Sequence, residues 1–338
     1  MVIALDDTMQ SMVGRAFRLA DYYEVGREQV RAFAGAVRND HPLHRDDAAA
    51  AERGLPGLLA SPTFTALLGG AAQTALATLL TDCDLTVAVQ TQQQLDFHRP
   101  VCVGDRLTST IALQSHRRAF GGDLLEVTNH IADQDGRAAV TSHTSLIARS
   151  AGGDLGKQLA DLNETVLRDG VGTPARAALD SVALPARTVP QSISDGLRRA
   201  SRPRVAVGDH LPARAYRVTY GDLVHYAGLS GDPNPIHWHE PAAALAGLGA
   251  GVVAHGMLTM GLGAGYLVSW AGDPRALRQY TVRWSGPLTV VPGTVSTLEF
   301  GGKIMALCRD SGIATVALTA TQNGRRVFGR ATAAVLMV

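Results

Sequence analysis

The sequence predicts an α+β fold made of two similar units, in which an antiparallel sheet wraps around one long helix. Two observations predict it. The same order of elements occurs twice along the chain, and in each half an apolar helical stretch is followed by alternating, β-branched segments. A sheet that wraps one buried helix covers the apolar faces of both with few elements. The length of 338 residues suits two domains of ordinary size.

The repeat opens in each half with an extended segment and an amphipathic helix. These stretches read YEVGREQVRAFAGAVRND over residues 23–40 and YRVTYGDLVHYAGLSGD over residues 216–232. Each ends in an aromatic-Ala-Gly turn, and an aspartate follows a few residues later. Residues 57–72 and 251–266 then form small-residue starts of long apolar helices. The shared order predicts one common architecture for the two halves.

Strands complete each half. Residues 96–107 and 283–295 both read as a strand, a turn with proline and a second strand, and Asp135-Gly136 and Asn323-Gly324 are strong hairpin turns. Residues 151–203 differ, because they are rich in Gly, Ala, Ser, Arg and Pro and lack a sustained pattern. We therefore expect an N-terminal unit at 1–150, a linker at 151–203 and a C-terminal unit at 204–338.

The bulk composition argues against several classes of function. With 31 basic and 30 acidic residues the net charge is +1, which gives no indication of a nucleic-acid partner. The three cysteines are scattered and no metal-ligand spacing or dinucleotide loop occurs, so we expect no metal and no cofactor. The sequence shows neither a signal peptide nor a long apolar run, which indicates a cytoplasmic protein without a membrane span.

The segment that carries chemistry runs from Tyr226 to His237. Pro233 and Pro235 cannot continue the preceding helix, so it must stop near residues 230–231. A stiff loop then holds Asp232 and His237 five residues apart, and Asn234 can close its own turn. A carboxylate beside an imidazole that titrates near neutral pH is suited to acid/base catalysis.

A second element, Ala254-His255-Gly256, lies where the long apolar helix of the C-terminal half starts. Free backbone N–H groups at a helix N-terminus can hold a developing oxyanion. Taken singly, an Asp before Pro is usually a turn residue and a His is usually a packed one. The order of the whole segment, followed by His255 and Gly256, favours a catalytic site.

These residues resemble the signature of the MaoC/(R)-hydratase group of hot-dog-fold proteins: a Gly-Asp, any residue, Asn-Pro-aliphatic-His, and His-Gly at a downstream helix start. The C-terminal half also resembles the B subunit of the actinobacterial type II fatty-acid-synthase (3R)-hydroxyacyl-ACP dehydratase, through AHGMLTMGLGAGYLVSWAGDP and RRVFGRA. The N-terminal half is similar to the companion A subunit, through YYEVGREQVRAFAGAV and FHRPVCVGD. The resemblance implies a fusion of the two, folded as a double hot dog with two sheets and two central helices.

The resemblance also implies roles for particular residues. Asp232 and His237 would be the catalytic pair, and the Gly256 amide would polarise the thioester carbonyl, with His255 and Asn234 at the oxyanion and substrate side. One departure is His239, which stands where the family often has an acidic residue.

The N-terminal half lacks the corresponding set of catalytic residues. Asp40 and His44 are four residues apart without the Asn-Pro spacer, and Pro62 stands where the repeat places Gly256. Proline has no N–H to give to an oxyanion. We therefore expect one active site per chain, with the N-terminal unit non-catalytic. Its small residues at 66–72 either leave room for an acyl chain or pack tightly on the sheet.

The expected function is a (3R)-hydroxyacyl-ACP dehydratase of fatty-acid elongation, a hydro-lyase that forms a trans-2-enoyl thioester. The alternatives are an enoyl-CoA (R)-hydratase of degradation or storage, a thioesterase on the same fold and a non-catalytic acyl-binding hot dog. The expected partner is an acyl carrier protein or CoA thioester. Which of Asp232 and His237 takes the α-proton stays open, as do chain length and the choice between a monomer and a homodimer.

Overall fold

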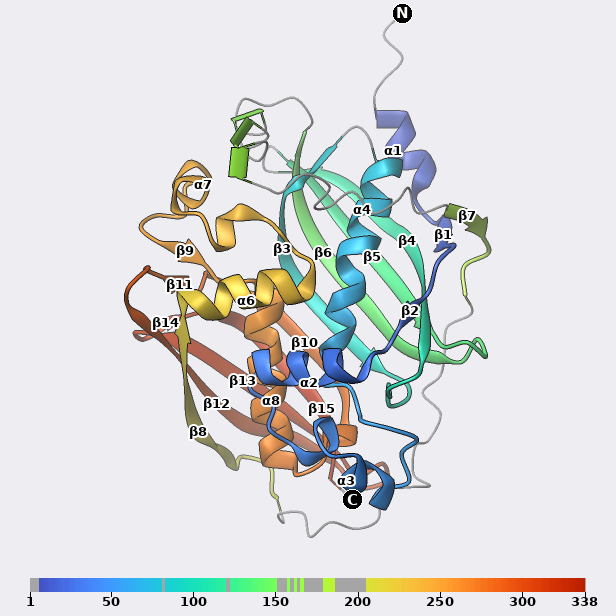
Figure 1. Cartoon of the computed structure of the whole chain (residues 1–338), viewed down its shortest axis with the longest axis vertical. Coiled ribbons are helices and arrows are strands. Elements are labelled where there is room, and N and C mark those ends of the chain that lie inside the picture. Colours follow the sequence, from blue (N-terminus) through green and yellow to red (C-terminus); the bar gives the residue numbers. More distant parts are fainter. Residues whose placement is uncertain are drawn as a thin grey trace, which may run out of the picture.

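The computed structural model describes residues 6–80, 83–119, 122–150, 179–185 and 205–337, together with the pairs 157–158, 161–162 and 165–166. The N-terminal half contains a set of helices and strands that ends in four long strands, in which β4, β5 and β6 form a meander and β3 pairs with β6 (Figure 1). Its elements are α1 (Asp6–Met12), β1 (Ala16–Leu19), β2 (Tyr23–Glu24), α2 (Arg27–Ala36), η1 (Pro42–His44), α3 (Asp47–Glu52), η2 (Phe64–Leu68), α4 (Gly69–Leu79), β3 (Cys83–Phe97), β4 (Arg106–Ala119), β5 (Gly122–Ala132) and β6 (Ala138–Ser150).

The C-terminal half repeats this order. Its elements are β8 (His210–Thr219), α6 (Tyr220–Ser230), η3 (Pro235–His237), α7 (Glu240–Leu245), β9 (Val252–Val253), α8 (Gly256–Ala271), η4 (Pro274–Ala276), β10 (Leu277–Trp284), β11 (Thr289–Val290), β12 (Val295–Cys308), β13 (Ile313–Gln322), β14 (Arg325–Arg326) and β15 (Phe328–Leu336). The α2–η1–α3 run corresponds to α6–η3–α7, and β3 to β6 correspond to β10, β12, β13 and β15. The internal repeat expected from the sequence is therefore present.

The expectation of two separate sheets is wrong. The long strands of both halves form one antiparallel sheet in the order β7-β1-β4-β5-β6-β3-β10-β15-β13-β12-β8, and β9 pairs separately with β11. The halves join where β10 pairs with β3, from Gln279 opposite Asp96 to Arg283 opposite Gln92. Each half would otherwise leave one of these strands with unpaired backbone N–H and C=O groups along its edge, and mutual pairing satisfies both.

The two central helices also differ. The helix α8 has 16 residues and is buried on nearly every side. A Cβ at Gly261 would overlap Val37 at the end of α2, and one at Gly263 would overlap the Tyr280 hydroxyl, so glycine permits this close packing. In the N-terminal half, the expected long helix is interrupted, because the 3-10 helix η2 gives way to the shorter α4 at Gly69.

Within the predicted linker, the structure describes mainly residues 179–185. There β7 (Leu179–Val182) pairs antiparallel with β1. Most of 151–203 otherwise lies outside the described residues. No helix in the described part of the chain combines the length and hydropathy needed to cross a bilayer.

Candidate active site

The loop that carries Asp232 is shaped by the end of α6. The helix ends at Gly231, whose φ of 70° is in the left-handed region that glycine adopts readily. The Asp232 side chain then accepts a hydrogen bond from the backbone N–H of Asn234 (3.2 Å), and the Asn234 side chain accepts one from the N–H of Ile236 (3.2 Å). These successive turns hold the loop as the two prolines predict. They also occupy the Asn234 Oδ1 within the loop.

His237 is fixed in one orientation. Its Nδ1 lies 2.7 Å from the carbonyl oxygen of Val253 and donates a hydrogen bond to it, because a carbonyl only accepts. The lone pair is then at Nε2, which lies 4.0 Å from the Asp232 Oδ2. Burial lowers the pKa of His237, and the nearby Asp232 carboxylate opposes part of that shift. His237 is therefore a neutral base, and the half-exposed Asp232 side chain lies between it and solvent.

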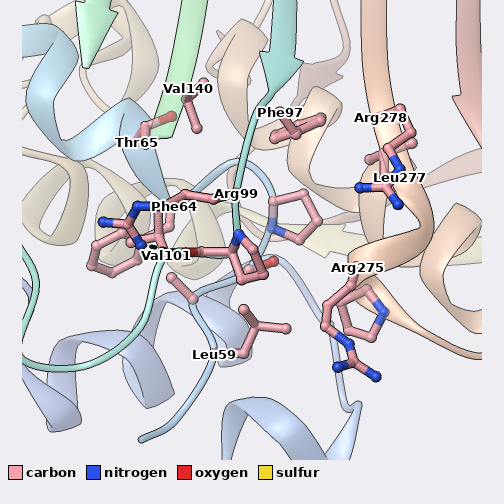
Figure 2. A pocket seen from close by; sticks show the side chains of 15 residues that line it. Leu59, Phe64, Thr65, Phe97, Arg99, Val101, Val140, Arg275, Leu277 and Arg278 are labelled. Carbon is pink, nitrogen blue, oxygen red and sulfur yellow. Dashed lines mark hydrogen bonds between the residues drawn. The ribbon is translucent and has the colours of Figure 1, made fainter. Parts of the chain in front are cut away.

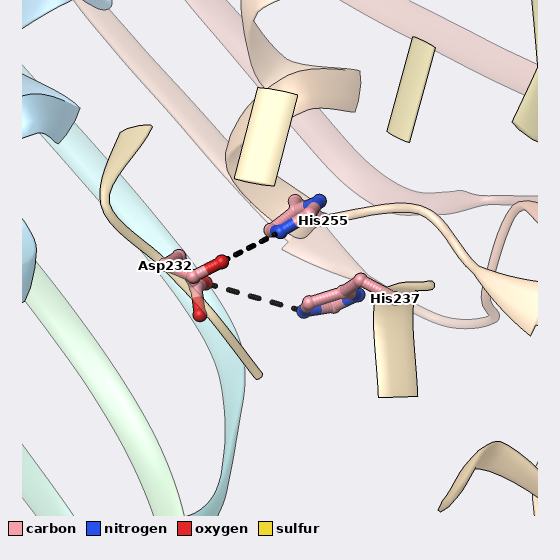
Figure 3. A group of neighbouring side chains, drawn as sticks. All are labelled: Asp232, His237 and His255. Carbon is pink, nitrogen blue, oxygen red and sulfur yellow. Dashed lines mark hydrogen bonds and ion pairs between the residues drawn. The ribbon is translucent and has the colours of Figure 1, made fainter. Parts of the chain in front are cut away.

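His255 lies against His237. Their rings are stacked with centroids 3.7 Å apart and 27° between planes (Figure 3). The Tyr226 ring also lies near His255, with centroids 5.0 Å apart and 57° between planes. The His255 Nε2 is 3.4 Å from the backbone oxygen of Asp232. Burial lowers the pKa of His255 well below its usual value, and His237 lowers it further. The stack therefore positions His237 without placing a second positive charge beside it.

Gly256 is the first residue of α8. Its N–H belongs to the first turn of a helix, where amides have no intrahelical acceptor, and the His255 side chain does not cap it. A Cβ at this position would meet the Trp284 ring at 3.2 Å and the Gln90 Oε1 at 3.5 Å. Trp284 is itself held by a hydrogen bond to Thr259. The amide end of α8 thus lies between a tryptophan of one half and a glutamine of the other.

Asp232, His237 and His255 also have metal-like spacing, since their ligand atoms lie within 4.8 Å of one another. A metal needs donor atoms that converge on one point at about 2.1 Å. Stacked imidazoles direct their nitrogens side by side instead, and His237 has already committed its Nδ1 to Val253. The geometry suits proton transfer better than metal ligation.

The corresponding place in the N-terminal half keeps one part of this arrangement. His44 Nδ1 donates to the Leu59 carbonyl oxygen at 2.6 Å, as His237 does to Val253. Asp40, however, is exposed and paired with Arg45 at 2.8 Å. Burial lowers the pKa of His44 to about 4. The histidine is thus kept as a buried, neutral residue, and the aspartate is engaged elsewhere.

A cavity of about 500 Å³, including its open mouth, lies beside Pro62 (Figure 2). Phe64 and Phe97 line it, together with Arg99 and Arg275. Both arginines are held in ion pairs, Arg99 with Asp105 and Asp133 and Arg275 with Asp273. This cavity offers apolar and cationic walls in place of an acid/base pair.

Sequence reasoning missed Gln90 and Trp284 as neighbours of the site, and it named Tyr226 only as the start of the segment, without its contact with His255. They come from β3, α6 and β10, and folding alone brings them to the start of α8. A weak signal existed for Gln90. The run QTQQQ at 90–94 is unusually polar for a strand that must place one face in a core.

Comparisons with known proteins agree with this architecture. The profile for the FAS1-like dehydratase domain region matches residues 11–142, and that for the MaoC-like domain matches residues 204–321. Curated relatives include UPF0336 proteins of Mycolicibacterium paratuberculosis (34% identical over 143 residues, 42% of this chain and 82% of that protein) and Streptomyces avermitilis (38% over 150 residues, 44% and 98%).

Among solved structures, one described as a MaoC-like dehydratase is 37% identical, with a TM-score of 0.86 over 98% of this chain and all of the other. A Mycobacterium tuberculosis protein described as a double hot dog is 18% identical, with a TM-score of 0.62 over 96% of each chain, and supports the fold alone. With a FAS1-like dehydratase region in its first half and a MaoC-like domain in its second, the chain belongs to the MaoC-like dehydratase family of double hot-dog proteins.

Proposed function

We propose that the chain is a (3R)-hydroxyacyl thioester dehydratase that acts on acyl carrier protein substrates in type II fatty-acid elongation. The observation that carries the proposal is the neutral, fixed His237, whose Nε2 faces Asp232 beside the amide end of α8. These are the three parts that elimination of water from a β-hydroxy thioester needs: a base, a group at the leaving hydroxyl and a donor to the carbonyl oxygen.

In this mechanism the Gly256 N–H donates a hydrogen bond to the thioester oxygen and stabilises the negative charge that develops there. His237 takes the α-proton at Nε2, which gives an enolate-like intermediate. The β C–O bond then breaks, and the proton leaves with the hydroxyl as water. Asp232 holds that hydroxyl and relays the proton from the imidazolium, so that both side chains return to their starting states. The same steps in reverse hydrate a trans-2-enoyl thioester.

Exposed arginines suit an acidic carrier protein and also the phosphates of CoA, two carriers that the test below distinguishes. Arg283, Arg325, Arg326 and Arg330 lie on β10, β14 and β15. Arg283 directly precedes Trp284, which contacts the Gly256 position. Such a basic surface suits an acidic protein that delivers a thioester to the site.

The test follows the ultraviolet absorbance of crotonyl and longer trans-2-enoyl groups on CoA and on acyl carrier protein, with thiol release measured in parallel. Wild type should consume the enoyl band without releasing thiol, and faster on the carrier protein. Asp232→Asn and His237→Ala should lose most of the rate, while Asp40→Asn should keep it as the matched control from the other half. A wild type inactive on both carriers would favour a non-catalytic acyl-binding protein, and a preference for CoA would favour an enoyl-CoA hydratase.

A further inference from the structure

A band of polar side chains divides the interior of the N-terminal half. Along β3 to β6 the inward-facing residues form two separate apolar clusters, one with Leu107 and Ile131 and the other with Ile111 and Val127. Between them the strand register places polar residues side by side on the same inner face. We call them the polar strip: Gln90, Gln93, Ser109, Asn129, Ser142 and Thr144.

The strip is hydrogen-bonded within itself but not fully. The Gln93 amide donates to Ser142 at 2.6 Å and accepts from Thr144 at 2.8 Å, and Gln90 donates to Gln93. At the far end, the Asn129 Nδ2 donates to Ser109 at 3.3 Å.

Two buried groups on the same interior face lack partners. The Asn129 Oδ1, on a side chain that is only 8% exposed, has no hydrogen-bond partner among the described residues, and neither does the buried Tyr23 hydroxyl. Tyr23 pairs with Leu107 and so projects to the same side of the sheet as Ser109. A buried acceptor and a buried donor left open in one interior are unusual and indicate a polar occupant.

The strip also reaches the active site. Its first member, Gln90, contributes the oxygen 3.5 Å from a Cβ on Gly256. On the helix side, the interruption between η2 and α4 falls at Gly69 and Gly70. A Cβ on Gly70 would lie 3.4 Å from the Gly231 carbonyl oxygen, next to Asp232, whereas one on Gly69 would meet nothing within 4 Å. The first two residues of α4 thus carry no side chains, and the second lies beside the loop that holds Asp232.

We propose that the polar strip selects acyl thioesters that carry oxygen beyond C3, hydroxylated or keto chains, over saturated hydrocarbon chains. This inference rests on the proposed dehydratase function and specifies its substrate class. The strip crosses the sheet from β3 through β6 to β5, about 10 Å at a strand spacing of about 4.8 Å, so Asn129 meets the distal part of an acyl chain of about eight carbons. An alkyl chain at this place would bury the amide and hydroxyl groups of the strip. It would offer them no hydrogen bonds in place of those that they make with water. A distal hydroxyl can donate to Asn129 and accept from the amides.

Alternatively, the polar strip has only a structural role, in which its hydrogen bonds stabilise the pairing of the four strands. Substrate selectivity separates the two readings, because a structural role changes activity toward all acyl chains alike. Sites built to hydrogen-bond a substrate group discriminate strongly against analogues that lack it.

The experiment compares kcat/KM for a trans-2-octenoyl thioester and its 8-hydroxy analogue. We expect wild type to favour the hydroxylated chain by about tenfold, the size of one net hydrogen bond. Gln93→Leu and Asn129→Leu should abolish or reverse that ratio. Thr144→Val, which removes only a hydroxyl, should reduce it even if the larger changes impair folding. Gln94→Leu, one residue along β3 on the outer face, is the matched control and should leave the ratio unchanged.

A wild type that prefers the plain octenoyl chain, or strip variants that slow both substrates equally, would overturn the inference. A crotonyl thioester is too short to reach Asn129, so its hydration tests the proposed dehydratase function independently of the selectivity. If crotonyl hydration proceeds and the eight-carbon ratio is one, only the selectivity is wrong. If wild type fails on crotonyl as well, the dehydratase function itself is wrong.

Discussion

Replacing Gly256 with proline should remove the donor to the thioester oxygen while leaving α8 intact. Proline is well suited to the first position of a helix, where its missing N–H has no intrahelical role. The preceding His255 has φ −53° and ψ 134°, within the extended region that a residue before proline requires. The N-terminal half already carries Pro62 at the equivalent place. The perturbation therefore acts mainly on one N–H.

The expected magnitude comes from two contributions. Loss of one preorganised oxyanion donor costs about 100- to 1000-fold in kcat, or roughly 3–4 kcal/mol. The added side-chain atoms meet Trp284 at 3.2 Å and Gln90 at 3.5 Å, so part of any loss is steric. Gly256→Ala brings the same Cβ contact but keeps the N–H, and we expect it to lose no more than about tenfold, on the scale of one modest packing change.

The assay is the rate of enoyl-thioester hydration for wild type, Gly256→Ala and Gly256→Pro, with thermal unfolding of each protein as the control for folding. The ratio of the alanine to the proline variant isolates the contribution of the amide. Equal rates for the two variants, with both folded, would refute the assignment of Gly256 as the oxyanion donor.

Three further predictions concern protonation and metal. Because burial lowers the pKa of His237, kcat/KM should stay level as the pH falls through 6.5 and decline only below it; a decline centred at or above 6.5 would contradict the buried neutral base. The pKa of His44 lies near 4 in the folded state and near 6.5 when unfolded, so the free energy of unfolding should fall by about 3 kcal/mol between pH 6.5 and 4, as measured by urea denaturation. His44→Asn should flatten that slope, and an unchanged slope would show that other groups cause it. A strong chelator should leave hydration unchanged, and inactivation restored by zinc would reverse our choice of proton transfer over metal ligation at Asp232 and His255.

Much of the fold could be predicted because its signals are local. The Asn-Gly and Asp-Gly hairpins, the apolar stretch from Gly256 and the repeated order of elements each follow from short-range preferences. The pairing of β3 with β10 could not be predicted. It depends on two strand edges that are about 180 residues apart in sequence and become partners only when the halves dock. The interruption at Gly69 was missed for a related reason, since glycine in an apolar stretch is equally compatible with a continuous, closely packed helix.

The candidate site was also predictable from the sequence only in part. Asp232, Asn234 and His237 lie on one stiff loop, so prolines and spacing were enough to single them out. His255 and Gly256 follow from a helix start. The hydrogen bond from His237 to Val253, which sets the tautomer, needs β9 to lie beside η3, and no local pattern encodes that contact. The roles of these residues in catalysis stay predictions that the variants above test.

The two halves depend on each other although only one is proposed to be catalytic. The carbonyl oxygen of Gly231, next to Asp232, lies beside Gly70 of α4, and Gln90 of β3 lies beside Gly256 at the start of α8. Arg38 at the end of α2 forms an ion pair with Asp222 of α6 at 2.9 Å. The C-terminal half alone would thus lose one wall of its own site as well as its edge pairing along β10. Under the proposed function, the N-terminal half with Pro62 and Asp40 supplies no acid/base pair, but Gly70 and Gln90 contribute to the surroundings of the catalytic loop and of the start of α8.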